Sequence, residues 1–419
     1  MEDALALSTL LRSGIAGASL RALLSHPRGE TGASGGSTPH AALAASALDD
    51  AQWRLLGVPA AAVLRIRRPD PRLRALDAAW LEVPGHRLIG WHDPDYPALL
   101  RRLEHPPAGL YVVGDVSLLW HPQVAVVGSR RPSAGGRDNA RSFARDFAAS
   151  GLVVCSGLAA GVDTEAHLGA MEVGRTVAVL GTGPDRCFPA DNAGLLARIG
   201  AGHAAVTEHP PGTPGIASHF PSRNRLIAGL SLGTVVIEAA LRSGALITAR
   251  LAAEAGREAF AVPGSIHNPM ARGCHRLIRE GAGLAESAQD VIPQLANLAA
   301  ELAASLRGRL ACTGGTDGGC GTGGEASAAA KRAPRERIGG RGGGGARAGE
   351  SPGPGLFPPA PPQHPDEALV WRCLGHDPVN LDQLSQRTGL TLGALSAMLL
   401  TLELEGRVTA EHGRYIRRS

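Results

Sequence analysis

Between about residues 123 and 300, short apolar runs alternate with segments of helical periodicity, and this alternation constrains the fold more than any other feature. The runs are rich in β-branched residues and apolar at consecutive positions, as in strands that are buried on both faces. They are Val124–Val127, Leu152–Cys155, Thr176–Leu180, Thr234–Ile237 and Ala259–Val262. Buried strands joined by helices form a parallel sheet with helices on both sides, so the sequence predicts a doubly wound α/β core over residues 96–300.

The N-terminal residues follow a different pattern. Up to about residue 95 the apolar positions recur at helical spacing, as in Leu5, Leu7, Leu10 and Leu11, which predicts a small helical domain over residues 1–95. Just after it, Leu110–Val113 is typical of a strand.

The residues that follow the core are dominated by glycine, proline and arginine. Of the 56 glycines and 30 prolines in the chain, many lie in residues 301–365, which cannot bury enough apolar surface to offset chain entropy. We expect a disordered linker there. Its part from Lys331 to Arg347 carries five arginines, Lys331 and Glu336, and a solvated spacer is favoured over a segment that holds DNA loosely.

Residues 366–419 show the pattern of a winged helix: helices over Leu381–Gly389 and Thr391–Leu404, then a hairpin over Val408–Ile416. The presumed recognition helix has no basic residue, whereas readout of the major groove needs Arg, Lys, Asn or Gln. A protein-contact or structural role is therefore favoured. The only plausible phosphate contacts of this domain are Arg414, Arg417 and Arg418.

Several classes of cofactor and site are excluded. Lys331 is the only lysine, so the chain has no Gly-Lys-Ser/Thr and no Walker phosphate loop. Gly181-Thr182-Gly183 begins a dinucleotide fingerprint, but Pro184 follows and the third glycine is missing. No cofactor is expected. No Cys-x-x-Cys pair occurs, which argues against a zinc site and against a disulfide framework; the six cysteines are Cys155, Cys187, Cys274, Cys312, Cys320 and Cys373.

No stretch reaches about 18 apolar residues, and the N-terminus lacks a basic segment followed by an apolar run. We therefore expect a soluble, cytoplasmic protein without a membrane partner.

Glycine-containing turns follow the first two core strands. Gly128, Ser129 and Arg130 follow the first, and Gly157 and Gly161 the second. In a parallel sheet these turns face the ligand crevice beside helix N-termini, which attract anions, so we predict phosphate contacts there. The alternative for Arg130 is a solvated or carboxylate-paired side chain.

After the second turn, Asp163 is predicted to cap the next helix. Asp163 and His167 are four residues apart, on one helical face, and so form a possible metal pair. No third ligand is evident, and no metal is predicted.

A more specific segment runs from His219 to Ser231. Arg223 and Arg225 flank Asn224 shortly after Phe220, and together they provide guanidinium forks, an amide and a stacking face. For Phe220, a buried core position is an equally weighted alternative. Hydroxyl contacts to phosphate are predicted downstream, from Ser243 and Thr248.

Five motifs occur in a fixed order: Val-Gly-Ser-Arg (127–130), Ser-Gly-Leu-Ala-x-Gly-Val-Asp-x-x-Ala-His (156–167), Phe-Pro-x-Arg-Asn-Arg-Leu-Ile-Ala-Gly-Leu-Ser (220–231), Ser-Gly-Ala-Leu-Ile-Thr-Ala-Arg (243–250) and Ala-Val-Pro-Gly (261–264). In this order they resemble the DNA-processing protein A (DprA/Smf) family, over about residues 90–295.

The resemblance implies an extended Rossmann-like core that forms homodimers, binds single-stranded DNA and helps to load RecA recombinase during natural transformation. It also implies DNA contacts by Arg130, Phe220, Arg223, Asn224 and Arg225. The core departs from this pattern in one respect, since it contains no lysine where relatives use lysine at the groove.

An enzyme is the main rival hypothesis, because a related Rossmann-like family cleaves nucleoside monophosphates near a Gly-x-Gly-Thr segment and an acid. Here Gly233-Thr234 is followed by Glu238, which does not match the pattern of those hydrolases. A nucleotide sensor is a further alternative. We predict a binding protein without catalytic residues, in which arginines and helix N-termini hold phosphates while Phe220 packs on a base.

Overall fold

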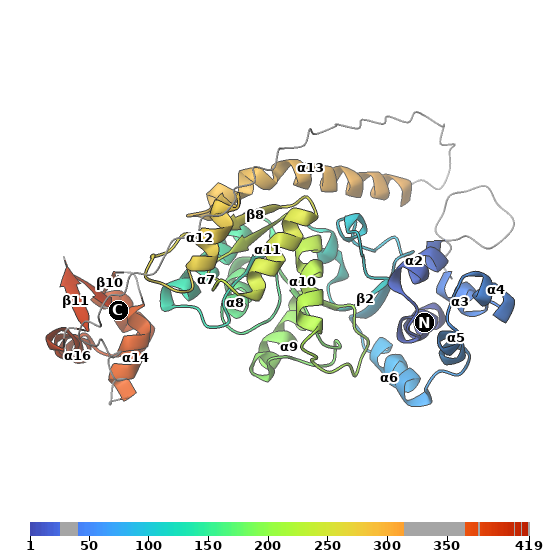
Figure 1. Cartoon of the computed structure of the whole chain (residues 1–419), viewed down its shortest axis with the longest axis horizontal. Coiled ribbons are helices and arrows are strands. Elements are labelled where there is room, and N and C mark those ends of the chain that lie inside the picture. Colours follow the sequence, from blue (N-terminus) through green and yellow to red (C-terminus); the bar gives the residue numbers. More distant parts are fainter. Residues whose placement is uncertain (26–40, 314–364, 376–377, 406, 412, 418–419) are drawn as a thin grey trace, which may run out of the picture.

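The computed structural model describes residues 1–25, 41–313, 365–375, 378–405, 407–411 and 413–417 (Figure 1). A helical N-terminal part lies on one side of a large sheet with its helices, and a small C-terminal part lies on the other (Figure 1).

The N-terminal part is helical, as its periodicity predicts. Local signals start several helices: Asp49 and Gln52 form a capping box, and Asp70 caps a helix whose first residue is Pro71. Leu10, Leu20 and Trp53 are buried in its core. The helices are α1 Glu2–Arg12, α2 Gly17–Ser25, α3 Ala41–Ser46, α4 Asp50–Leu55, α5 Ala60–Arg67 and α6 Pro71–Leu81.

Within the described residues, nine strands form one sheet in the order β1-β2-β6-β5-β4-β3-β7-β8-β9. Neighbours from β6 to β9 are parallel, whereas β1 and β2 are antiparallel additions at one edge. The strands are β1 His86–Gly90, β2 Gly109–Gly114, β3 Gln123–Val127, β4 Val153–Ser156, β5 Thr176–Val179, β6 Ala204–Thr207, β7 Gly233–Val236, β8 Glu258–Ala261 and β9 Gly283–Leu284. The doubly wound α/β prediction is confirmed.

All five predicted core strands are present, with bounds displaced by one residue at most. The strand predicted over Leu110–Val113 is also present, as β2. The sequence reading missed β1, β6 and β9. Because β1 pairs with β2, the sheet begins before the boundary predicted at residue 95.

Helices cover both faces of the sheet. Along β3, Ala125 and Val127 enter the core beneath α10, α11 and α12, whereas Val124 and Val126 enter the core beneath α7, α8 and α13. The helices of this part are η1 Leu100–Arg102, η2 Val116–Trp120, α7 Ala134–Ala149, α8 Val162–Val173, η3 Ala190–Asn192, α9 Ala193–Gly202, α10 His219–Leu230, α11 Gly244–Glu254, α12 Arg272–Arg279 and α13 Ala288–Thr313.

Helix α13 corrects one prediction. It continues to Thr313, so the first residues of the segment 301–365 are helical rather than a disordered linker. Continuous helical propensity from Leu298 onward and the burial of Leu302 account for the extension. Residues 314–364, including the arginine-rich stretch 331–347, lie outside the described residues.

The C-terminal part confirms the predicted winged helix. A capping box at Asn380 starts α15, and Gly389, with a φ of 71°, ends it in a left-handed turn. Arg387 of this part forms a 2.5 Å ion pair with Asp138 of α7. Its elements are α14 Pro365–Leu374, β10 Val379–Asn380, α15 Leu381–Thr388, α16 Leu392–Leu404, β11 Val408–Glu411 and β12 Arg414–Arg417.

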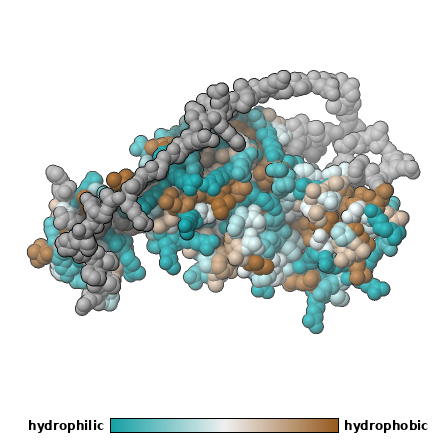
Figure 2. Space-filling view, viewed as in Figure 1, coloured by the Kyte–Doolittle hydropathy of each residue, from teal (hydrophilic) through white to brown (hydrophobic). Residues whose placement is uncertain are grey.

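Among the described residues, none of the helices combines the length and hydrophobicity that a bilayer crossing requires. On the face shown in Figure 2, hydrophobic residues appear in small groups between hydrophilic ones.

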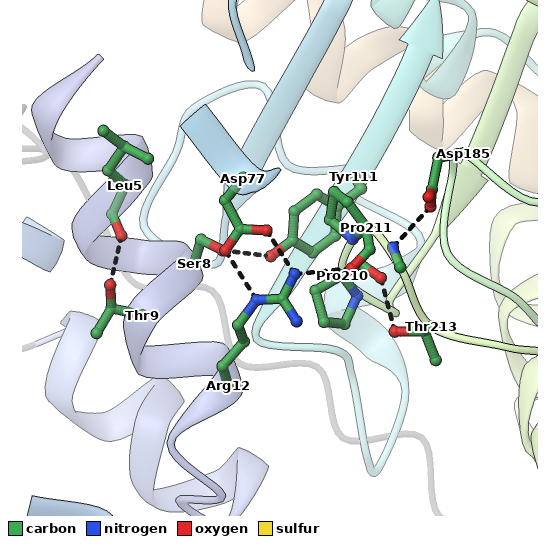
Figure 3. Close-up of polar contacts among 11 residues, drawn as sticks. Leu5, Ser8, Thr9, Arg12, Asp77, Tyr111, Asp185, Pro210, Pro211 and Thr213 are labelled. Atoms are coloured by element: carbon green, nitrogen blue, oxygen red, sulfur yellow. Dashed lines mark hydrogen bonds and ion pairs between the residues drawn. The ribbon is translucent and has the colours of Figure 1, made fainter. Parts of the chain in front are cut away.

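A buried polar network joins the helical part to the sheet (Figure 3). Asp77 of α6 receives both arms of the Arg12 guanidinium, Nε at 2.8 Å and Nη2 at 2.5 Å, and also the hydroxyl of Ser8. Ser8 contacts the hydroxyl of Tyr111 on β2 at 2.9 Å, and Arg12 Nη2 donates to the Pro211 carbonyl at 2.8 Å. The network therefore links two helices, one strand and one loop.

Asp77→Ala should lower the free energy of unfolding by about 3 kcal/mol, because it leaves the partly buried Arg12 without its counter-charge. The matched control is Asp50→Ala, which removes an exposed ion pair with Arg67 and should cost less than about 1 kcal/mol. Urea titration followed by circular dichroism measures both. Equal losses would contradict this role of the network.

A second buried polar contact joins α8 to the sheet. Thr176 on β5 donates its hydroxyl to the Val154 carbonyl at 2.7 Å, and therefore accepts from His167 Nδ1 at 2.7 Å. His167 Nε2 is buried without a partner among the described residues. Burial, together with the charge of Arg223, lowers the pKa of His167 from 6.5 to about 3. The imidazole is therefore neutral in the fold.

His167 should make the protein less stable as the pH falls. An unfolded chain protonates this imidazole near pH 6.5 and the folded chain only near pH 3, so unfolding takes up a proton in this window and stability declines from pH 6.5 downward. His167→Gln should reduce the slope of unfolding free energy against pH by about 0.7 kcal/mol per pH unit at pH 6.5, rising to about 1.4 kcal/mol per pH unit near pH 5. Urea titrations at several pH values measure the slope, and identical slopes for both proteins would contradict the assignment.

Candidate nucleic-acid interface

A pocket of about 560 Å³ opens at the carboxyl ends of β3, β4 and β7. The chain runs from β3 through β4 and β5 to β6 on one side, and then returns to β7 on the other side of β3. Between β3 and β7 the connections therefore diverge, and this is where open α/β sheets bind ligands. The wall is formed by turns after these strands, the first turns of α10 and α11, and the loop that precedes α10.

Helix α11 points its N-terminus at the pocket. Ser243 caps the helix by accepting from the Ala245 N–H at 3.3 Å, and Ser243, Gly244 and Thr248 line the wall. The free N–H groups of a first helical turn carry partial positive charge and attract anions. The hydroxyls predicted at Ser243 and Thr248 are thus brought to the pocket, although the hydroxyl of Ser243 is engaged by its own helix.

An exposed arginine and two aromatic rings lie side by side in the pocket. The Arg130 guanidinium carbon is 6.0 Å from the Phe220 ring centroid, and the rings of Phe188 and Phe220 are 4.9 Å apart with a tilt of 44°. Phe188 is 50% exposed and Phe220 is half-buried, so Phe220 is a wall residue and not a core aromatic. The three side chains present a cation and aromatic faces to the same space.

Arg223 also lines the pocket, and its guanidinium has a structural role there. Its side chain is buried, and Nη1 donates to the Gly157 carbonyl at 2.5 Å and to the Val179 carbonyl. Burial lowers the pKa of Arg223, and the nearby carboxylate of Asp163 opposes this shift. Nη1 is thus engaged by the protein, and Arg223 joins α10 to the ends of β4 and β5. The predicted phosphate contact of its guanidinium stays a prediction, since Arg223 also lines the pocket.

Asp163 does not cap α8 as predicted. Gly161 occupies the N-cap position, and the Asp163 carboxylate accepts from the N–H groups of Gly157 at 3.1 Å and Ala159 at 3.3 Å. Burial raises the pKa of Asp163, whereas Arg223 and these N–H groups oppose the shift. Asp163 lies two residues beyond the N-cap position, and its carboxylate binds backbone N–H groups of the turn after β4 instead of those of the helix.

The other two polar residues of the α10 motif, Asn224 and Arg225, lie in different places. Asn224 lines the pocket, and its Nδ2 donates to the Gly244 carbonyl at 3.4 Å, which ties α10 to the start of α11. Arg225 is not part of the pocket. It forms an ion pair with Glu208 and donates to the His105 carbonyl at 2.7 Å, in another groove. The structure therefore does not bring Arg225 together with Arg130, and the DNA contact predicted for Arg225 stays a prediction.

The glycines and Ser129 mostly serve the packing of the turns. Gly128 lines the pocket, and a Cβ there would lie 2.7 Å from Val162 Cγ2. A Cβ at Gly161, whose φ is +84°, would lie 2.5 Å from the Ser129 carbonyl oxygen, and one at Gly157 would lie 2.5 Å from Arg223 Nη1. Ser129 is buried and accepts from the Arg131 N–H at 3.0 Å. The pocket lining does not include Gly157, Gly161 or Ser129. The prediction of phosphate contacts there is therefore not supported.

Sequence reasoning missed Phe188 as a site residue. It precedes η3 and α9, far along the chain from the α10 motif, and reaches the pocket only because the loop after β5 folds against α10. The signal that was available is compositional, since the chain has only six phenylalanines and Phe188 lies in a polar turn.

The carboxylate of Glu238, the acid considered for the hydrolase alternative, is engaged in hydrogen bonds within the protein. It is buried, and its oxygens accept from the Ser133 N–H at 2.8 Å, the Ser133 hydroxyl at 2.6 Å and Asn268 Nδ2 at 2.8 Å. It therefore fixes the start of α7 to the end of β7. In the part of the chain that the structure describes, no three His, Cys, Asp or Glu side chains come together as metal ligands would.

Comparison with known proteins assigns the sheet with its helices and the C-terminal winged helix. A family model described as DNA recombination-mediator protein A matches residues 87–296, and one for the DprA winged helix domain matches residues 354–414. The DNA processing protein DprA of Streptococcus pneumoniae is 45% identical over 203 residues, which are 48% of this chain and 72% of that protein. Protein Smf of a Synechocystis species is 36% identical over 332 residues, 78% of this chain and 79% of that protein.

The fold gives the same result. The crystal structure of the S. pneumoniae DprA matches with a TM-score of 0.59 and 34% identity, covering 69% of this chain and 97% of that one. The order of the motifs, the sheet with its pocket at the divergence of β3 and β7, and the C-terminal winged helix thus agree with one assignment: the chain belongs to the DNA recombination-mediator protein A family, known as DprA or Smf.

Proposed function

We propose that this chain binds single-stranded DNA in the pocket between the strand ends and α10, with Arg130 and the N-terminus of α11 on phosphates and Phe188 and Phe220 on bases. One observation carries the proposal: an exposed aromatic pair, an exposed arginine and a helix N-terminus meet in one open pocket.

The charges of the pocket suit a polyanion. Arg130 is exposed and forms no ion pair with any described residue, so its guanidinium is available to a phosphate. Arg223 and Asp163 beneath it are engaged within the protein. Phosphate binding by one arginine and one helix N-terminus does not depend on base identity, so we expect slight sequence preference.

The aromatic pair favours single strands over duplex. Bases of a duplex are stacked on each other, whereas an unpaired base offers a face to Phe188 or Phe220, a contact typically worth about 1–3 kcal/mol.

Binding without turnover is the simplest chemistry for this pocket. A hydrolase that cleaves nucleoside monophosphates needs a carboxylate directed at the substrate, but Asp163 and Glu238 are both engaged by backbone or side-chain donors. His167 is buried behind the wall. The enzyme and sensor alternatives are therefore not favoured.

The family resemblance supports three further parts of the proposal: a homodimer, loading of RecA during transformation, and a cytoplasmic location. For the winged helix we propose a protein contact, because α16 has no basic residue and exposes Leu392, Leu400 and Leu404. Arg417, one of the residues considered for phosphate, lies 4.1 Å from the Trp371 ring centroid.

Arg130 and Arg225 provide a sharp test. Arg130→Gln should weaken binding of an oligothymidylate about ten-fold, because a charge-assisted phosphate contact is lost, and should reduce the salt slope by about 0.7. Arg225→Gln removes the same charge outside the pocket and should change affinity less than about two-fold. Fluorescence anisotropy over a salt series measures both. If Arg225→Gln weakens binding as much as Arg130→Gln, the pocket is not the site.

The aromatic contacts can be tested separately. Phe188→Ala and Phe220→Ala should each cost about 1–3 kcal/mol of binding free energy without changing the salt slope, because no phosphate contact is lost. Phe188→Trp should retain the affinity and show quenched fluorescence when an oligothymidylate is added. Unchanged affinity of both alanine variants would contradict base stacking in the pocket.

A further inference from the structure

The helical part contains a second cavity, of about 540 Å³, between α1, α5 and α6. Its polar lining is dominated by guanidinium groups, from Arg12, Arg65, Arg68 and Arg74, with Asp70 and Asp77 as the carboxylates. Neither the resemblance nor the proposed function assigns anything to this groove.

The carboxylates of the groove are already engaged. Asp77 is buried and holds Arg12 in a two-armed contact, and Asp70 accepts from the Arg72 N–H at 2.8 Å as the cap of α6. Arg65 donates one arm, Nη1, to the Ser13 carbonyl at 2.6 Å. With four guanidinium groups and two carboxylates, the groove has an excess of positive charge.

Arg68 and Arg74 are the free cations of the groove. Both are exposed, and neither forms an ion pair with any described residue. Several guanidinium groups around one cavity repel one another unless an anion is present, and planar guanidinium forks match phosphate oxygens in pairs. The groove therefore has the chemistry of a phosphate site.

One loop connects this groove to the pocket. The carbonyl of Pro211 in this loop accepts a hydrogen bond from Arg12 Nη2 at 2.8 Å (Figure 3). The next residue, Gly212, packs on α6, since a Cβ there would lie 2.9 Å from Leu76 Cδ2. Further along, Gly215 and Ala217 line the DNA pocket. Residues 211 and 215 are four positions apart, so their Cα atoms are at most about 14 Å from each other.

We propose that the groove of Arg65, Arg68 and Arg74 is a second phosphate-binding site, which holds the sugar-phosphate backbone of the same single strand after it crosses the loop 210–217. This rests on the proposed function of the pocket. The ligand class is the phosphodiester chain of single-stranded nucleic acid, and the groove contributes charge and length of contact without base recognition.

The test compares two probes and two charge-matched variants of the full chain. The groove variant is Arg68→Gln with Arg74→Gln, and the control is Arg54→Gln with Arg72→Gln, which removes two exposed arginines of the same helical part that do not line the groove. The probes are labelled oligothymidylates of about 6 and about 20 nucleotides, the shorter chosen to fill the pocket alone. Anisotropy over a salt series gives affinity and slope, and circular dichroism verifies the fold.

The groove variant should bind the long probe about ten-fold more weakly, with a salt slope reduced by about 1.4, because two phosphate contacts are lost. Its affinity for the short probe, and the affinity of the control for both probes, should match the wild type. The proposal is overturned if the control loses as much as the groove variant, if the short probe is affected as much as the long one, or if nothing changes. Failure of the proposed function itself has a different signature, namely that the wild-type chain binds neither probe.

Discussion

The buried guanidinium of Arg223 is the interaction on which the site depends most. It donates to the Gly157 carbonyl beyond β4 and the Val179 carbonyl of β5, while the carboxylate of Asp163 closes the turn between β4 and α8 from the same side. A buried charge is tolerated only where polar groups and an opposite charge compensate it. This requirement fixes the position of α10 against the strand ends, and so places Phe220 and Asn224 in the pocket wall.

The pocket and the helical part share structural support. Arg12 and Asp77 hold the loop at Pro211, and the same loop continues to Gly215 and Ala217 in the pocket. The loop therefore gives the helical part a direct structural connection to the pocket wall, beyond its role as a covering of the sheet edge at β1 and β2.

The site residues illustrate how far a motif can be interpreted from sequence. The α10 motif is correctly placed at the ligand crevice, because glycine-containing turns and strand ends identify that crevice. The roles within it are not predictable, because residues 223 and 225 are two positions apart and a helix turns by about 200° between them. One arginine is therefore buried beneath the pocket while the other pairs with Glu208 in a different groove.

The sequence by itself determined the parallel core, the helical N-terminal part and the winged helix, because apolar periodicity and capping are local properties of the chain. It also predicted Gly128, Arg130, Phe220, Asn224, Ser243 and Thr248, which line the pocket. Strand β6, with the small residues Ala204 and Ala205, has little β propensity of its own and is a strand only because β2 and β5 flank it. Only the tertiary structure decided which arginines are without an ion pair among the described residues. It also decided that Phe188 lies in the pocket, since burial and pairing depend on contacts between segments distant in the chain.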